Sequence, residues 1–221
     1  MPHKRRRGLG PRLRFKAVRQ RADPLPMRAI AVLLVVVGAV AALGFARHED
    51  RVREQDQLGA IASDLAGRSV GVRCPSFLAS LVDTRAEAGR VQFDNAGHPA
   101  NHTDLSPQTC KALRHLAGVD FTCIERGDCG FREFNAGWAA HTLAHEAFHL
   151  RGFQDEGVTE CYALQNTAFV AERLGVPTQQ AQDLQAWLYK RGYPNEPTEY
   201  RSPQCYNGGP LDLRPQQALF P

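Results

Sequence analysis

Two histidines and a glutamate between residues 145 and 149 have the types and the spacing needed to bind a metal ion. His145 and His149 are four residues apart, so on a helix their imidazoles lie on the same face, one turn from each other. Glu146 follows the first histidine directly, in the pattern His-Glu-x-x-His. In this pattern the ion lowers the pKa of a bound water and the glutamate acts as general base. The segment therefore predicts a Zn²⁺ site with Glu146 as the catalytic residue.

A tetrahedral zinc site needs a third protein ligand, and acidic residues follow the motif immediately. Asp155, Glu156 and Glu160 are the candidates. Glu156 and Glu160 are one turn apart on one face of an expected helix, so either carboxylate could reach back to the metal. The residues alone leave three alternatives open: Glu156, Glu160 or Asp155 as the third ligand.

Two zinc peptidase families resemble this region. The run His145-x-x-x-His149-x-x-Gly152-x-x-Asp155 resembles the extended metzincin motif, although no methionine follows Met27 to form the Met-turn of that family. The segment from Glu156 to Glu160 resembles the Glu-x-x-x-Asp segment of membrane-associated gluzincin peptidases, with Glu160 in the place of the Asp. The gluzincin resemblance implies that Glu156 ligates zinc and that Glu160 orients a histidine.

The resemblance covers about residues 138–168, and its specific part is the five-residue motif at 145–149. It implies a zincin-like fold of the α+β class, in which two helices supply the metal ligands beneath a small sheet. The edge strand of such a sheet would hold an extended peptide, and by position we expect residues 131–134 to belong to that edge.

Hydrophobic periodicity and turn residues predict the elements that must position these side chains. Strands are expected at 69–73, 90–94 and 119–124, with a helical turn at 77–82. Helices are expected at 108–116, behind Ser106 as N-cap and Pro107, and at 136–151, 156–174 and 178–191.

The N-terminal part of the chain predicts a membrane anchor. Residues 1–28 hold ten Lys or Arg against one Asp, and residues 29–46 read AIAVLLVVVGAVAALGFA, eighteen residues without a charge. That length suffices to cross a bilayer as a helix, and the basic flank predicts a cytoplasmic N-terminus. We interpret the basic residues as a topology signal that contacts membrane lipid, and we expect no nucleic-acid partner. The chain is then divided into a cytoplasmic tail (1–28), an anchor (29–46), a juxtamembrane stalk (47–66), an extracytoplasmic domain (67–205) and a C-terminal tail (206–221).

All six cysteines lie after the anchor, and an even number on the exported side predicts disulfide bonds. Fifteen pairings are possible, of which Cys123–Cys129, closing a short loop, is the one we expect. Cys161 is expected to be half of a disulfide. The chain has no Cys-x-x-Cys pair, which argues against a structural thiolate zinc site.

Other polar residues near the motif have simpler explanations. His141, one turn before His145, is expected to be a solvated histidine or one satisfied within the core. Tyr162, Tyr189 and Tyr193 could donate a hydrogen bond to a transition state, but ordinary packing explains each of them.

The sequence as a whole favours a membrane-anchored, extracytoplasmic zinc-dependent metallopeptidase with a peptide or protein substrate. The alternative is a disulfide-braced binding domain at the cell surface that keeps the zincin-like scaffold without catalysis.

Overall fold

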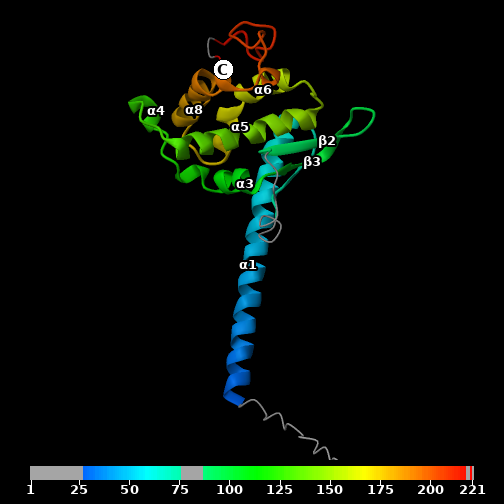
Figure 1. Ribbon diagram of the computed structural model, residues 1–221, viewed down its shortest axis with the longest axis vertical. Coiled ribbons are helices and arrows are strands. Elements are labelled where there is room, and N and C mark those ends of the chain that lie inside the picture. The colour runs from blue at the N-terminus through cyan, green and yellow to red at the C-terminus, as the bar shows by residue number, and fades with distance from the viewer. Residues whose placement is uncertain (1–26, 76–86, 218–219, 221) are drawn as a thin grey trace, which may run out of the picture. The chain divides into compact units, whose positions relative to one another are not determined.

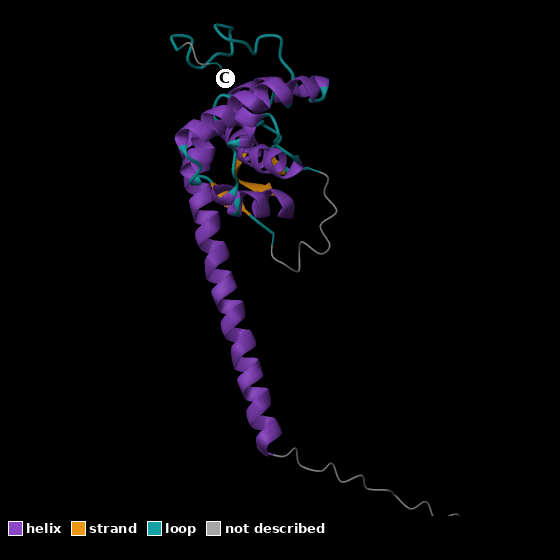
Figure 2. Cartoon of the chain, turned by 90° about the vertical axis from the view of Figure 1, so that its left-hand side faces the viewer, coloured by secondary structure: helices purple, strands orange, loops and turns teal. Residues whose placement is uncertain are grey.

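The computed structural model describes residues 27–75, 87–217 and 220. The described residues form a helix-rich fold with a small three-stranded sheet (Figures 1 and 2). The α-helices are α1 (Met27–Ala66), α3 (Pro107–Arg114), α4 (Cys123–Arg126), α5 (Phe131–Arg151), α6 (Glu156–Leu164), α7 (Thr167–Arg173) and α8 (Thr178–Arg191). The strands are β1 (Gly71–Arg73), β2 (Gly89–Phe93) and β3 (Pro99–Leu105), and the 3₁₀ turns are η1 (Leu116–Gly118), η2 (Tyr193–Asn195) and η3 (Thr198–Tyr200). The basic tail up to residue 26 and the turn expected at 77–82 lie outside the described residues.

The chain divides into two units, residues 1–45 and 46–221. In the described part of the first unit, α1 is long and apolar enough to cross a membrane. Its most apolar window of eighteen residues has a mean hydropathy of 2.8 and is not buried inside the protein. Large apolar side chains such as Val35 and Phe45 are exposed along it.

The second unit begins within α1. The residues that were expected to form a stalk continue this helix, and Leu58, Ile61 and Ala62 near its end are buried in the hydrophobic core. Arg68 then fastens the following turn, because its guanidinium donates hydrogen bonds to the carbonyl oxygens of Ala100 and Leu150. The last turns of α1 are therefore part of the folded domain.

The sheet has the order β1-β3-β2, with β1 parallel and β2 antiparallel to the central strand β3. The turn between β2 and β3 has the expected chemistry: Asp94 accepts hydrogen bonds from the backbone of Ala96 and His98, and Gly97 has a φ of 81°. The strands expected at 69–73 and 90–94 are confirmed as β1 and β2. The central strand β3 was not predicted.

Two strand predictions were wrong. Residues 119–124 form a turn and the start of α4, which the Cys123–Cys129 disulfide and Gly127 (φ 74°) close. Residues 131–134 are the first turn of α5, where the Glu133 carboxylate accepts from the backbone N–H of Gly130. The disulfide and the left-handed glycine thus outweigh the apolar residues of 119–124, and the cap formed by Glu133 begins a helix at 131–134.

Helix α5 is the centre of the second unit, and it packs against both the sheet and α6 (Figure 1). It begins five residues earlier than expected and ends as expected at Gly152, which has a φ of 113°. Between Ala136 and Leu150 almost every residue of α5 is buried. Alanines and glycine on the helix allow close approach, and Gly137 packs directly against Leu184 of α8.

One helix predicted after α5 is two shorter helices in the structure. A single helix over 156–174 was expected, but the chain breaks into α6 and α7 at Gln165 and Asn166. The Gln165 side chain donates to the carbonyl oxygen of Leu211 and accepts from the backbone of Leu213, so a distant segment fixes the break. Helix α8 and the α3 start at Ser106 are as predicted.

The six cysteines form three disulfides: Cys74–Cys110, Cys123–Cys129 and Cys161–Cys205. The expected Cys123–Cys129 pair is confirmed, and Cys161 is half of a disulfide as expected. Cys161–Cys205 joins α6 to the segment after η3, and its partners are 44 residues apart in the sequence.

We predict that removing the Cys161–Cys205 disulfide destabilises the domain more than removing Cys123–Cys129. The entropy of the unfolded chain favours the longer loop, with roughly 4 kcal/mol for a separation of 44 and roughly 2 kcal/mol for a separation of 6. Urea unfolding of the full-length chain in detergent, followed by tryptophan fluorescence, measures both paired Cys→Ser variants. Equal losses in the free energy of unfolding would contradict the prediction.

Candidate metal centre

The site is built by two helices and the short connection between them. Helix α5 carries His145, Glu146 and His149, and α6 carries Glu156 and Glu160. Gly152 ends α5 in a left-handed conformation, and after the three residues 153–155 α6 begins at Glu156 and packs back against α5. Because the connection is so short, the first turns of α6 face the last turns of α5.

A single carboxylate oxygen lies between the two motif histidines. Glu156 Oε2 is 3.0 Å from His145 Nε2 and 3.1 Å from His149 Nε2. Donor atoms about 2.1 Å from a tetrahedral ion are about 3.4 Å apart, so these two contacts need to lengthen by only a few tenths of an ångström to accommodate one. The three residues line a cavity of about 630 Å³. His145, His149 and Glu156 therefore form a group that could hold a metal ion.

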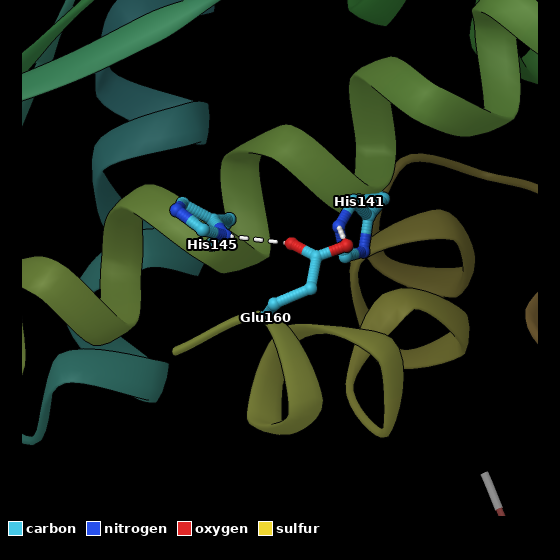
Figure 3. Close-up of side chains that lie close together, drawn as sticks. All are labelled: His141, His145 and Glu160. Atoms are coloured by element: carbon cyan, nitrogen blue, oxygen red, sulfur yellow. Dashed lines mark hydrogen bonds and ion pairs between the residues drawn. The ribbon is translucent and has the colours of Figure 1, made fainter. Parts of the chain in front are cut away.

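The outer nitrogen of His145 is held by a second carboxylate. His145 Nδ1 lies 2.9 Å from Glu160 Oε2, and the other oxygen of Glu160 lies 2.9 Å from His141 Nε2 (Figure 3). Figure 3 shows the Glu160 carboxylate from α6 placed between the two rings of α5. Glu160 and His141 are both 2% exposed. A carboxylate that accepts from Nδ1–H fixes the ring and leaves Nε2 free to bind a metal.

His149 is fixed in the same way by the backbone. Its Nδ1 lies 2.7 Å from the carbonyl oxygen of Phe153, in the connection between α5 and α6. Donation from Nδ1–H to that oxygen directs Nε2 toward Glu156. Both motif histidines thus have one nitrogen bound to the protein and the other facing the cavity.

A second group of donor atoms, from His141, His145 and Glu160, is also close enough to hold a metal. In this group each carboxylate oxygen already pairs with a different imidazole nitrogen, and His141 Nδ1 is 3.2 Å from Thr167 Oγ1. Ion pairs with His141 and His145 balance the charge of Glu160 without a metal, although the contact between Glu160 Oε1 and His141 Nε2 lacks the angles of a hydrogen bond. This group therefore supports the first group from behind. His141, expected to be solvated or satisfied within the core, is buried and paired.

Glu146 lines the same cavity and is 4% exposed. Thr103 of the central strand β3 donates a hydrogen bond of 3.2 Å to Glu146 Oε2. Strand β2 passes so close that a Cβ on Gly89 would lie 2.7 Å from Glu146 Cγ. The sheet therefore both orients the carboxylate and limits its movement.

Burial and pairing set the charges of these groups in the metal-free protein. Burial raises the pKa of Glu146, although His145 and His149 oppose the rise. Burial also acts against ionisation of Glu156 and Glu160, but hydrogen bonds and charge interactions with the histidines lower the pKa of each to about 2. For His145 burial favours the neutral ring, and the hydrogen bonds to Glu156 and Glu160 prevail, raising its pKa to about 10.

The structure separates the three acidic candidates of the sequence. Glu156 lies against both Nε2 atoms, whereas Glu160 contacts only the outer nitrogen of His145. Asp155 is exposed and caps α6, its Oδ1 accepting from the backbone N–H of Val158 at 2.9 Å. Of the three, Glu156 is therefore the carboxylate that lies beside both motif histidines.

None of the three tyrosines considered from the sequence lines the cavity. The ring of Tyr162 packs against Phe148 and Phe153, and the hydroxyls of Tyr189 and Tyr193 donate to the backbone oxygens of Cys205 and Ser202.

Sequence reasoning missed Thr103, Glu196 and Tyr200, which lie far from the motif in the chain. Thr103 contacts Glu146, and the other two line the cavity. The Tyr200 ring centroid is 5.7 Å from that of His145. Burial raises the pKa of Glu196 and of Tyr200, and neighbouring glutamates add to both shifts. No spacing pattern in the sequence connects these residues to the motif.

In comparisons with known proteins, no family model matches this chain, and neither a curated protein nor a solved structure gives a match. The candidate site therefore stands on its own residues and geometry.

We predict that the metal-free chain loses the stabilisation due to His145 at alkaline pH. The folded pKa of about 10 exceeds the unfolded value of 6.5, so this stabilisation is complete below pH 6.5 and disappears as the pH rises to 10. The measurement is the free energy of unfolding of wild type and His145→Asn over this range, in the presence of a chelator. The difference between them should shrink with rising pH, and a constant difference would disprove the assignment.

We also predict a graded loss of zinc affinity among the acidic variants. Glu160→Gln should weaken binding about 10- to 100-fold, because the carboxylate that orients His145 is lost. Glu156→Gln should weaken it further, because a ligand is removed. Asp155→Asn is the matched control, since Asn also caps helices well and the site is untouched. Competition with a chromophoric chelator measures all three, and an affinity loss confined to Asp155→Asn would overturn the ligand assignment.

Proposed function

We propose that this chain is a membrane-anchored, extracytoplasmic zinc-dependent metallopeptidase. The observation that carries the proposal is the position of one Glu156 oxygen within 3.1 Å of both His145 Nε2 and His149 Nε2, in a cavity that Glu146 also lines. Two imidazoles and one carboxylate are a known ligand set of catalytic zinc, which keeps its remaining position for water or substrate.

The residues of the site have separate roles in the proposed reaction. When bound, zinc lowers the pKa of a coordinated water and polarises a carbonyl oxygen. Glu146 accepts the proton of the attacking water and returns it to the leaving amine. The raised pKa of Glu146 suits this double role, because a carboxylate that binds a proton more readily is a better base. Glu160 and the Phe153 carbonyl hold the two imidazoles in orientation throughout.

The substrate we propose is an extended peptide bound along β2. This strand is at an edge of the sheet, and Gly89, Val91 and Phe93 line the cavity beside the metal ligands. A strand edge offers unpaired backbone groups with which a peptide can form a further strand. Tyr200 lines the same cavity, with its ring centroid 5.7 Å from that of His145, which supports a role for its hydroxyl as hydrogen-bond donor to the carbonyl oxygen under attack.

The location follows from α1 and from the cysteines. The apolar part of α1 would span the membrane, with the basic residues before it on the cytoplasmic side. Three disulfides in the domain that follows agree with an oxidising compartment outside the cytoplasm.

Metal analysis together with peptide hydrolysis tests the function. We expect the full-length chain in detergent to bind about one zinc ion and to cleave members of a broad peptide library. Glu146→Gln should keep the zinc and lose activity by about 10²- to 10⁴-fold, because only the general base is removed.

His149→Ala is the control that should lose both the metal and the activity. Zinc binding without cleavage of any library peptide would favour a non-catalytic binding domain. If the chain does not bind zinc near one ion per molecule, both the zinc peptidase and a zinc-binding domain without catalysis are refuted.

A further inference from the structure

Glu196 is a cavity residue with no role in holding the metal or in the proposed proton transfer. It lies between η2 and η3 and lines the cavity together with Trp138, His141 and Tyr200. Its side chain is partly buried and forms no hydrogen bond or ion pair with any other residue that the structure describes. A carboxylate in this position is available to a ligand in the cavity.

The segment that carries Glu196 is held firmly. The Cys161–Cys205 disulfide ties its end to α6, and the backbone of Arg201 lies against Gly157 of α6. Tyr193 adds a reciprocal pair of hydrogen bonds, since its hydroxyl donates to the backbone oxygen of Ser202 and accepts from the backbone N–H of the same residue. Glu196 therefore has a fixed place relative to the metal ligands.

The balance of charge in the cavity favours a positive ligand at this position. Five glutamates line the cavity, against Arg90 and the three histidines His141, His145 and His149. Glu146 and Glu156 face the metal, and Glu160 is paired with two histidines. Glu87 and Arg90 are exposed at the rim and have opposite charges. This leaves Glu196 as a carboxylate without a hydrogen-bond or ion-pair partner among the described residues; the charge of Glu160 repels it, and His141 and His145 attract it from a distance.

We propose that Glu196 is a specificity residue that binds a cationic ammonium or guanidinium group of the substrate close to the scissile bond. This inference rests on the proposed peptidase function and names the class of peptide that the site selects. Trp138 lines the same cavity as Glu196 and is fixed there by close packing on Gly192, where a Cβ would lie 2.6 Å from the indole ring. An aromatic wall beside a carboxylate is a favourable environment for a cation.

The cationic group has two sources in a peptide, the side chain of Lys or Arg and the free N-terminus. Matched peptide pairs distinguish them. One pair replaces Lys by acetyl-lysine at each position of an otherwise neutral library, and the other compares a free with an acetylated N-terminus.

The test measures binding and cleavage separately, with the full-length chain in detergent. Binding is measured by fluorescence anisotropy of labelled peptides on Glu146→Gln, with and without zinc, and cleavage on the wild-type chain. We expect at least one cationic peptide to bind and react about tenfold better than its neutral partner. Glu196→Gln should abolish this preference with zinc content unchanged, and Glu196→Lys should reverse it in favour of acidic peptides.

Glu199→Gln is the matched control, because Glu199 is an exposed carboxylate in the same segment and does not line the cavity. Reversal by Glu196→Lys is a readout that a purely structural role would not give. If zinc binds and peptides are cleaved but the preference survives Glu196→Gln, the inference is wrong and the proposed function stands. If no zinc binds and no peptide is cleaved, the proposed function fails, and the binding data on the metal-free protein still decide whether Glu196 selects cations. Equal binding of both members of every pair overturns the inference in either case.

Discussion

The candidate site depends on one buried interaction, the pairing of the Glu160 carboxylate with His145 and His141. A carboxylate that is 2% exposed is costly to bury without partners, and here each of its oxygens lies 2.9 Å from an imidazole nitrogen (Figure 3). The interaction joins α5 to α6 across the centre of the domain. It also determines which nitrogen of His145 faces the cavity. The same interaction therefore packs α6 against α5 and orients His145 as a candidate metal ligand.

From this pairing the other parts of the site follow in order. Once α6 is fixed against α5, Glu156 one turn earlier must lie beside the Nε2 atoms of both motif histidines. The sheet closes the opposite side, because Thr103 and Gly89 approach Glu146 directly. The Cys161–Cys205 disulfide then brings Glu196 and Tyr200, from a segment without regular secondary structure beyond 3₁₀ turns, to the cavity wall. Each part therefore makes a different contribution: the helices carry the candidate metal ligands, the sheet orients Glu146, and the cross-linked segment adds residues to the cavity wall.

Local patterns in the sequence predicted the residues whose positions are set by helix geometry. His145 and His149 share a face of α5 because they are four residues apart, and Glu146 follows the first of them. The C-terminal end of α5 follows from Gly152, and the start of α8 from the residues around Thr178. The central strand β3 was missed because Pro99, Asn101 and Asp104 are poor strand formers. Its pairing with β1 on one side and β2 on the other outweighs that local preference. The break between α6 and α7 was missed for a related reason, since it depends on hydrogen bonds from Gln165 to residues 46 and 48 positions away. Glu196 and Tyr200 reach the site only through a disulfide and turn contacts, which no local pattern encodes.

The central claim is that His145, His149 and Glu156 bind one zinc ion. X-ray absorption at the zinc K-edge of the zinc-loaded, full-length chain tests this claim most directly, because it reports the atoms around the metal. The account predicts two imidazole nitrogens and carboxylate or water oxygens at about 2.0–2.2 Å, with no sulfur neighbour, and loss of an oxygen contribution in Glu156→Gln. A spectrum without imidazole scattering, or one that Glu156→Gln leaves unchanged, would contradict it.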